Sequence, residues 1–317
     1  MAMLTFPRLS ITLAGALALA PLLAPSAASA HPAFPATIPL PAGSQPEGIT
    51  SGPGTTFYAG ARADGAITKG NLRTGVTRTL VAGQAGRVAV GMRLDASTGR
   101  LWVAGGPTGA VTAYDATTGA ELARYVVAGS RFLNDVEVTR NAVYVTDSLN
   151  AELVVVPLGK HRSLPKSPTL LPLRGDFAQL PGFDANGIRA LPGGQLVINR
   201  SADGALFRVN PMTGVADRIE TTGRVLTSGD GLELRGSTLY DVYGFSRDSI
   251  AVIKLGRGAR TATVTRELTN SHLDRPTTTT FVAGALWTVN GRFSTPPTPT
   301  TSYSVVRVST SVDNPRS

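Results

Sequence analysis

The chain has 317 residues, of which 42% are hydrophobic and 16% charged, with 35 glycines, 22 prolines and no cysteine. This content of apolar and turn-forming residues excludes a disordered or coiled-coil protein, and the lack of cysteine excludes a disulfide scaffold or a thiolate-bound metal. The formal net charge of +9 comes from scattered basic residues rather than a dense run or an aromatic-interleaved stripe, so nucleic-acid binding is not indicated.

The first thirty residues have the pattern of a secretory signal. Arg8 precedes an uncharged, mostly apolar run over 11–24, and the small residues Ala28 and Ala30 end the segment. A short basic region, an apolar region and an A-x-A site are typical of export. The run is too short to span a bilayer, and no later stretch is longer. We therefore predict a signal peptide over 1–30, cleavage near Ala30, secretion, and one domain over 31–317.

From Glu47 onward the chain repeats a unit of four short runs in which apolar and polar residues alternate. Alternation with a period of two between Gly, Asn, Asp or Thr-Gly turns indicates β-strands. The strands predicted for the first five units are 48–52, 55–61, 66–72 and 76–81; 91–96, 100–104, 110–115 and 122–127; 135–139, 142–146, 152–158 and 169–173; 187–191, 195–199, 205–210 and 216–221; and 231–234, 238–243, 249–255 and 261–268.

The sixth unit has only three such runs, which are 281–283, 285–289 and 304–308. Its missing strand is supplied by 36–40, because pairing the start of the chain with its end hides two open sheet edges. Four-stranded repeats of roughly 40–50 residues are typical of propeller blades. The sequence therefore predicts an all-β, six-bladed β-propeller closed by its N-terminal strand, in preference to a β-sandwich. The segments 159–181 and 293–302 are predicted loops.

One aligned residue in each unit precedes the first strand, and these residues are Glu47, Val90, Asn134, Asn186, Asp230 and Thr279. First strands line the central channel of a propeller, so we expect these side chains to converge at one mouth. Two carboxylates and two amide oxygens favour a hard divalent cation between them, Ca²⁺ first, with Mg²⁺ or Mn²⁺ as alternatives. Thr279 could hold water or substrate through its hydroxyl.

Taken singly, the residue pairs at these positions have ordinary explanations. Asn186-Gly187 and Asp230-Gly231 are common tight-turn dipeptides, and only their shared register favours a common site. Zinc is not indicated, because there is no cysteine and the three histidines, His31, His161 and His272, all lie off the aligned positions.

The order Glu-Gly, Asn-Asp, Asn-Gly and Asp-Gly, each pair opening a blade, resembles the senescence marker protein–gluconolactonase family and, more distantly, the paraoxonases. Members of that family are six-bladed propellers that bind one divalent cation in the channel and hydrolyse sugar lactones or related esters. The resemblance implies that Glu47, Asn186 and Asp230 are direct metal ligands. Asn134 would complete the metal site or contact substrate. Arg131 is similar to a family arginine that contacts substrate, although one extra residue separates it from Asn134.

These features lead to a functional hypothesis with an open alternative. A divalent-metal-dependent hydrolase would act on a small-molecule lactone or ester, with Asp230 taking a proton from the attacking water. The alternative is a non-catalytic secreted propeller that serves as a ligand- or protein-binding platform. A metal-dependent lyase on the same scaffold would be expected to carry neighbouring bases such as histidine. No Gly-x-Ser-x-Gly elbow supports a serine hydrolase.

Overall fold

The computed structural model describes residues 1–5, 7, 33–129, 131–224 and 227–311. The predicted signal over 1–30, with its cleavage site near Ala30, lies almost entirely outside these residues. The chain divides into the units Met1–Ala33 and Phe34–Ser317, and all strands belong to the second. No helix within the described ranges is long and apolar enough to cross a membrane.

Six sheets, or blades, follow one another along the chain. Blades 1 and 2 contain β2 (Pro46–Ser51), β3 (Thr56–Ala61), β4 (Ile67–Asn71) and β5 (Thr77–Val81), then β6 (Met92–Asp95), β7 (Arg100–Ala104), β8 (Ala110–Asp115) and β9 (Glu121–Val126). Blades 3 and 4 contain β10 (Leu133–Val138), β11 (Ala142–Asp147), β12 (Glu152–Pro157) and β13 (Thr169–Pro172), then β14 (Arg174–Gly175), β15 (Ala185–Ala190), β16 (Leu196–Arg200), β17 (Ala205–Val209) and β18 (Val215–Arg218). Blades 5 and 6 contain β19 (Glu220–Thr222), β20 (Leu232–Arg235), β21 (Thr238–Tyr243), β22 (Ser249–Leu255) and β23 (Thr261–Thr269), then β24 (Pro276–Val282), β25 (Ala285–Asn290), β26 (Tyr303–Ser309) and the early β1 (Thr37–Leu40). Two short 3₁₀ helices are η1 (Lys160–Arg162) and η2 (Arg257–Ala259).

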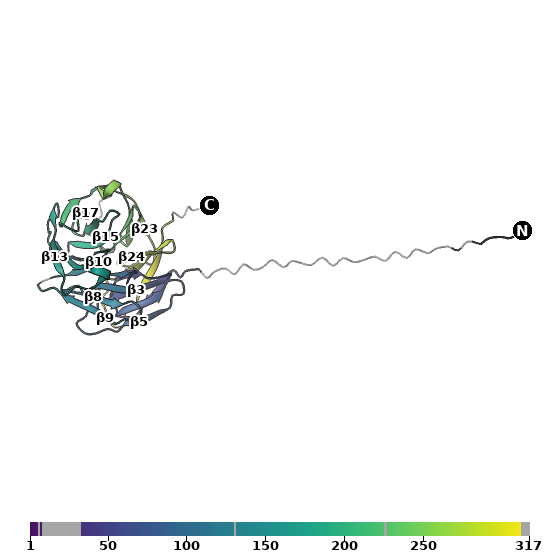
Figure 1. Ribbon diagram of the computed structural model, residues 1–317, viewed down its shortest axis with the longest axis horizontal. Helices are drawn as coiled ribbons and strands as arrows, with labels where there is room; N and C mark the ends of the chain where they lie inside the picture. Colours follow the sequence, from purple (N-terminus) through teal and green to yellow (C-terminus); the bar gives the residue numbers. More distant parts are fainter. Residues whose placement is uncertain (6, 8–32, 130, 225–226, 312–317) are drawn as a thin grey trace. The chain divides into compact units, whose positions relative to one another are not determined.

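The blades are arranged in a closed ring (Figure 1). Each inner strand contacts the inner strand of the next blade, in the order β2, β6, β10, β15, β20, β24 and back to β2. β1 pairs antiparallel with β26, from Thr37 opposite Val306 to Leu40 opposite Tyr303. The predicted six-bladed propeller closed by its N-terminal strand is therefore confirmed.

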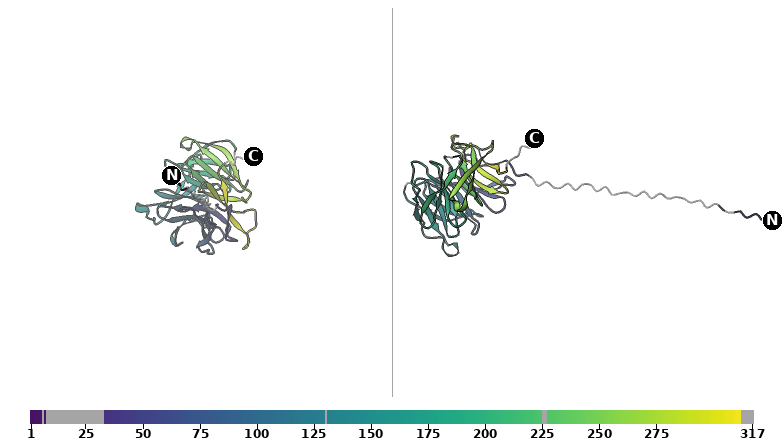
Figure 2. Two further views of the ribbon diagram at one scale, coloured as in Figure 1. Left: turned by 90° about the vertical axis from the view of Figure 1, so that its right-hand side faces the viewer. Right: turned by 90° about the horizontal axis from the view of Figure 1, so that it is seen from above.

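Two blades have a fifth strand that the sequence pattern did not indicate. β14 pairs in parallel with β18, and β19 pairs in parallel with β23. Within the predicted loop 159–181, β13 matches the predicted strand 169–173, and η1 and β14 are further elements, whereas 293–302 has no strand. Figure 2 shows the sheets from two further sides.

Apolar side chains between neighbouring blades form the core. Trp102 of β7 is fully buried and packs in one cluster with Val145 and Val154 of blade 3. At the closure, Ile38 of β1 packs in a cluster that also contains Trp287 of the last blade. Burying one such side chain contributes about 1.5–3 kcal/mol, so the N-terminal strand stabilises the ring by packing as well as by hydrogen bonds.

Candidate functional site

The inner strands begin with a bulge that positions one side chain in each of several blades. In β2, Pro46 pairs with Ala61 and regular pairing resumes only at Ile49. A bulge of this kind redirects the residue within it, which in β2 is Glu47. The same irregularity occurs at the start of β10, β15 and β24.

Glycines next to these residues let adjacent blades approach closely. A Cβ at Gly48 would lie 2.1 Å from the carbonyl oxygen of Val90 in the next blade. Gly187 donates its N–H to the carbonyl of Asp230 at 3.1 Å, and an added Cβ there would lie 2.6 Å from the same oxygen. Neither glycine has a positive φ. Both glycines therefore serve contact between blades, and Asn186-Gly187 is not the tight turn that the dipeptide would suggest by itself.

In the last blade the equivalent residue is Thr277, two positions before the predicted Thr279. Pro276 pairs with Asn290 as Pro46 pairs with Ala61 in blade 1. The Thr277 hydroxyl donates to the carbonyl of Glu47 at 2.6 Å and joins the last blade to the first.

The structure does not bring Thr279 to the central pocket. Its side chain is fully buried, and its hydroxyl shares a 2.9 Å hydrogen bond with that of Thr288. The run of four threonines over 277–280 offers no apolar alternation from which its register could be read.

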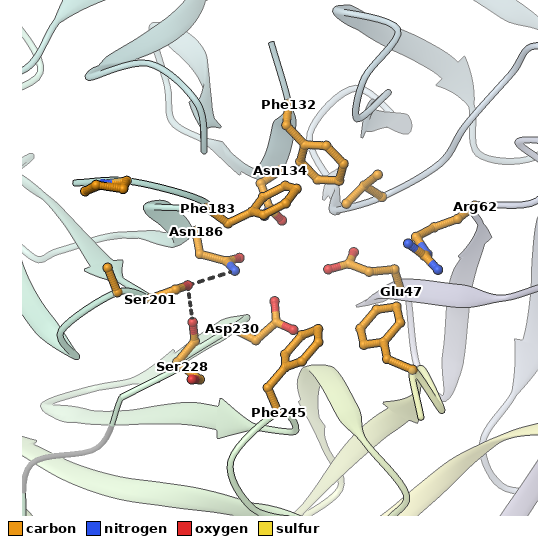
Figure 3. A pocket seen from close by; sticks show the side chains of 15 residues that line it. Glu47, Arg62, Phe132, Asn134, Phe183, Asn186, Ser201, Ser228, Asp230 and Phe245 are labelled. Atoms are coloured by element: carbon orange, nitrogen blue, oxygen red, sulfur yellow. Dashed lines mark hydrogen bonds between the residues drawn. The ribbon is translucent and has the colours of Figure 1, made fainter. Parts of the chain in front are cut away.

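A pocket of about 510 Å³ lies where the other predicted residues meet (Figure 3). Glu47, Asn134, Asn186 and Asp230 come from four different blades and direct their side chains toward one space. Val90 also lines the pocket but adds no polar group. The predicted convergence of two carboxylates and two amides is thus present in the structure.

Two serines fix the orientation of the amides. The Asn134 side-chain nitrogen donates to the Ser148 hydroxyl at 2.9 Å, and that of Asn186 donates to the Ser201 hydroxyl at 3.2 Å. Each serine then donates, at 2.6 Å, to a carbonyl of the next blade, just before Asn186 for Ser148 and just before Asp230 for Ser201. We call the aligned residue at the start of each inner strand the axial residue of its blade. With its nitrogen engaged, Asn186 keeps its amide oxygen buried without a donor.

The two carboxylates are held in an environment that disfavours their charge. Burial raises the pKa of Glu47 well above its usual value, Asp230 and Asp135 raise it further, and Arg62 acts in the opposite direction. Burial also raises the pKa of Asp230 to about 8, partly offset by a hydrogen bond from Asn186 and reinforced by Asp135. One oxygen of Glu47 is buried without a hydrogen-bond partner. A cation would stabilise both charges.

Arg62 is a pocket residue that the sequence pattern did not indicate. It follows β3, beside Glu47, and its guanidinium stacks on Phe293 at 4.6 Å from the ring centre (Figure 3). Its Nε is buried without an acceptor among the described residues. Arg62, Ser148 and Ser201 are equivalent, because each backbone N–H donates to the carbonyl two residues before the axial residue of its blade.

The predicted substrate arginine, Arg131, does not line this pocket. Its guanidinium donates to the Ala128 carbonyl at 2.8 Å, to Asp147 at 3.0 Å and to Glu152. These bonds hold the side chain within blade 3 and give it a structural role there.

Four phenylalanines form the walls of the pocket. Phe132 and Phe183 meet edge to face at 4.7 Å, and Phe245 and Phe293 stack at 4.9 Å. All four lie outside the strands, between one blade element and the next. Strand periodicity therefore gives no information about them.

Charged side chains cross the channel three residues further along the inner strands, about 10 Å deeper. Arg93 contacts Glu137 at 3.5 Å and Glu233 at 3.2 Å, and Arg189 contacts Glu233 at 3.6 Å. Arg189 also pairs with Asp135 at 2.8 Å. The alternation of arginine and glutamate links blades 2 to 5 beneath the pocket.

The donor set fits a hard cation better than zinc. Among the described residues, no group of three or more His, Cys, Asp or Glu could hold a metal ion, and half of this set consists of amides. Carboxylate and amide oxygens are the ligands that Ca²⁺ takes. His161 and His272 are not among the lining residues, and His31 lies outside the described residues.

No family model and no curated protein matches the chain. The structure is similar to the major allergen Mala s 1 of Malassezia sympodialis, with a TM-score of 0.68, 15% identity, and coverage of 90% of this chain and 99% of that one. It is similar to virginiamycin B lyase of Staphylococcus aureus, with a TM-score of 0.54, 9% identity, and coverage of 86% and 98%. It is also similar to a protein of unknown function from Bacteroides thetaiotaomicron, with a TM-score of 0.59, 15% identity, and coverage of 83% of this chain and 69% of that one. At these identities the likeness shows the fold alone.

Proposed function

We propose that the axial pocket binds one divalent cation, with Ca²⁺ preferred, and that the protein hydrolyses a lactone or related ester there. The supporting observation is the set of uncompensated oxygens: Glu47 and Asn186 each keep a buried acceptor without a donor, and Asp230 has a pKa of about 8. Burying a carboxylate without compensation is costly. Arg62 supplies one positive charge for two carboxylates, which leaves room for a further cation.

The residues of the pocket have distinct parts in this proposal. Glu47, Asn134, Asn186 and Asp230 would hold the cation, which when bound supplies Lewis acidity toward a carbonyl and its oxyanion. Asp230, whose carboxylate lines the same space, would accept a proton from the attacking water. Arg62 points its guanidinium into the same space and stabilises negative charge as it develops.

Two other functions are less well supported. One structural neighbour is a lyase by name, but no histidine is among the described residues that line this pocket, and the ionisable side chains there are Glu47, Asp230 and Arg62. A non-catalytic platform requires no buried, uncompensated carboxylates at its centre, and strongly shifted pKa values gather at functional sites. The hydrolase therefore accounts for more of the pocket.

The test is a panel of lactones and esters, assayed with millimolar Ca²⁺ and with chelator. We expect turnover that requires the cation and falls at least 100-fold in Asp230→Asn, within the range of general-base losses. Glu220→Gln, an exposed carboxylate of β19, is the matched control and should retain activity. Turnover that survives both chelator and Asp230→Asn would overturn the proposal. Binding of Ca²⁺ without any turnover would support the platform.

A further inference from the structure

We infer that the substrate carries an apolar acyl or aryl substituent, held between the two phenylalanine pairs, and is not a polyhydroxylated sugar lactone. This inference rests on the proposed function, because it names the substrate class of the same pocket. Two features support it, namely the exposure of the aromatic walls and the lack of free polar groups on them. The charge balance at the base supports the carboxylate product that any lactone would give.

The aromatic walls present exposed apolar surface around a charged base. Phe183 and Phe245 are 52% and 55% exposed, one from each pair, and both line the pocket. The other residues that line the pocket include the apolar Val90, Pro181 and Ala202. Burying apolar surface is favourable in proportion to its area, so a ligand with an apolar substituent gains by covering these rings. A polyol has too little apolar surface to gain binding free energy by covering these rings.

Above the polar base, the walls of this pocket offer sugar hydroxyls few partners. The Ser201 hydroxyl is already used twice, because it accepts from Asn186 and donates to the Gly229 carbonyl. The Asn134 nitrogen donates to Ser148, and of the two lining serines only Ser228 has a hydroxyl without a described hydrogen bond. A desolvated hydroxyl without a partner is penalised, so a ring with several hydroxyls is disfavoured.

The charges at the base favour a ligand that becomes a monoanion. With a divalent cation balancing Glu47 and Asp230, the charge of Arg62 remains uncompensated. Its guanidinium is held against Phe293 and its Nε has no acceptor among the described residues. Hydrolysis of a neutral lactone adds water across the acyl C–O bond and gives a hydroxy-carboxylate with release of one proton. Arg62 is placed to bind that carboxylate.

The first experiment uses three δ-lactones with the same six-membered ring: glucono-δ-lactone, δ-valerolactone and δ-decalactone, each in millimolar Ca²⁺. We expect kcat/KM for δ-decalactone to exceed that for the other two by at least about tenfold. Phe183→Ala and Phe245→Ala should each lower the ratio between δ-decalactone and δ-valerolactone about three- to tenfold. Leu122→Ala, 45% exposed on β9, is the matched control and should leave the ratio unchanged.

The second experiment measures binding without turnover, by calorimetry with 5-hydroxydecanoate and gluconate in the presence of Ca²⁺. We expect 5-hydroxydecanoate to bind at least about tenfold more tightly, and Arg62→Met to weaken it by a similar factor. Binding of 5-hydroxydecanoate with no lactone turnover would support this ligand class while the hydrolase fails. Preference for gluconate or glucono-δ-lactone, or an unchanged ratio in both phenylalanine variants, would overturn the inference while leaving the hydrolase intact.

Discussion

Replacing Asp230 with asparagine should make the metal-free protein more stable at alkaline pH. Asp230 is 4% exposed, and burial raises its pKa from 3.8 to about 8. Between these values the folded state keeps a proton that the unfolded state has lost, so the free energy of unfolding falls as pH rises from about 4 to about 8. About four pK units at about 1.4 kcal/mol each set an upper limit of about 6 kcal/mol for this loss. Asparagine cannot ionise, so Asp230→Asn avoids this loss of stability.

The assay is urea unfolding of wild type and Asp230→Asn at pH 5 and pH 8, each with chelator and with millimolar Ca²⁺. In chelator, wild type should lose several kcal/mol between pH 5 and pH 8, and the variant should lose clearly less. Ca²⁺ should restore wild type at pH 8 and have little effect on the variant. Asp217→Asn, an exposed aspartate of β18, should behave as wild type. Equal pH dependence in wild type and Asp230→Asn would refute the reasoning.

Three further predictions concern the support of the pocket and the ring. Ser201→Ala frees the Asn186 amide to rotate, so Ca²⁺ affinity measured by calorimetry should fall about 10- to 100-fold. Arg189→Met leaves Asp135 without its buried partner and should lower the free energy of unfolding by about 3–5 kcal/mol in urea titrations. Deletion of 37–40 exposes the edge of β26, and size-exclusion chromatography should show aggregation.

Each of these has a contradicting result. Unchanged Ca²⁺ affinity in Ser201→Ala would mean that the serine does not orient the amide. Stability within about 0.5 kcal/mol of wild type in Arg189→Met would mean that the channel ion pairs are not coupled to folding. A monodisperse, fully stable protein without 37–40 would show that the ring does not depend on its N-terminal strand.

The fold and four of the site residues were predictable because both follow from the blade repeat. Glu47, Asn134, Asn186 and Asp230 stand next to small or acidic residues that mark the start of a strand, so their register is visible along the chain. Thr277 has no such marker within a run of threonines, and the predicted Thr279 is displaced by two positions.

The rest of the pocket depends on contacts that strand periodicity does not report. Arg62, Ser148 and Ser201 do share a position, after the second strand of their blades, and alignment of the repeat at that point would have found them. Phe183 and Phe245 come from connections whose course is set by the fold as a whole. Proximity in sequence to an axial residue is a poor guide to which side chains line the pocket. Arg131, three residues before Asn134, binds Asp147 and Glu152 instead.

The channel ion pairs did leave a signal in the sequence. Arg93, Glu137, Arg189 and Glu233 each lie three residues after the axial residue of their blade, and their charges alternate from blade to blade. In the sequence pattern of one strand, a single charged residue indicates a position that faces solvent. The ring becomes apparent only when the four blades are aligned on the same residue.

The central claim is that four oxygens from separate blades hold one cation. A crystal structure of the protein grown with millimolar Ca²⁺, with an anomalous difference map to identify the ion, tests it most directly. We expect one ion about 2.3–2.6 Å from side-chain oxygens of Glu47, Asn134, Asn186 and Asp230. A map without an ion in the axial pocket, or with the ion bound elsewhere on the propeller, would contradict the claim.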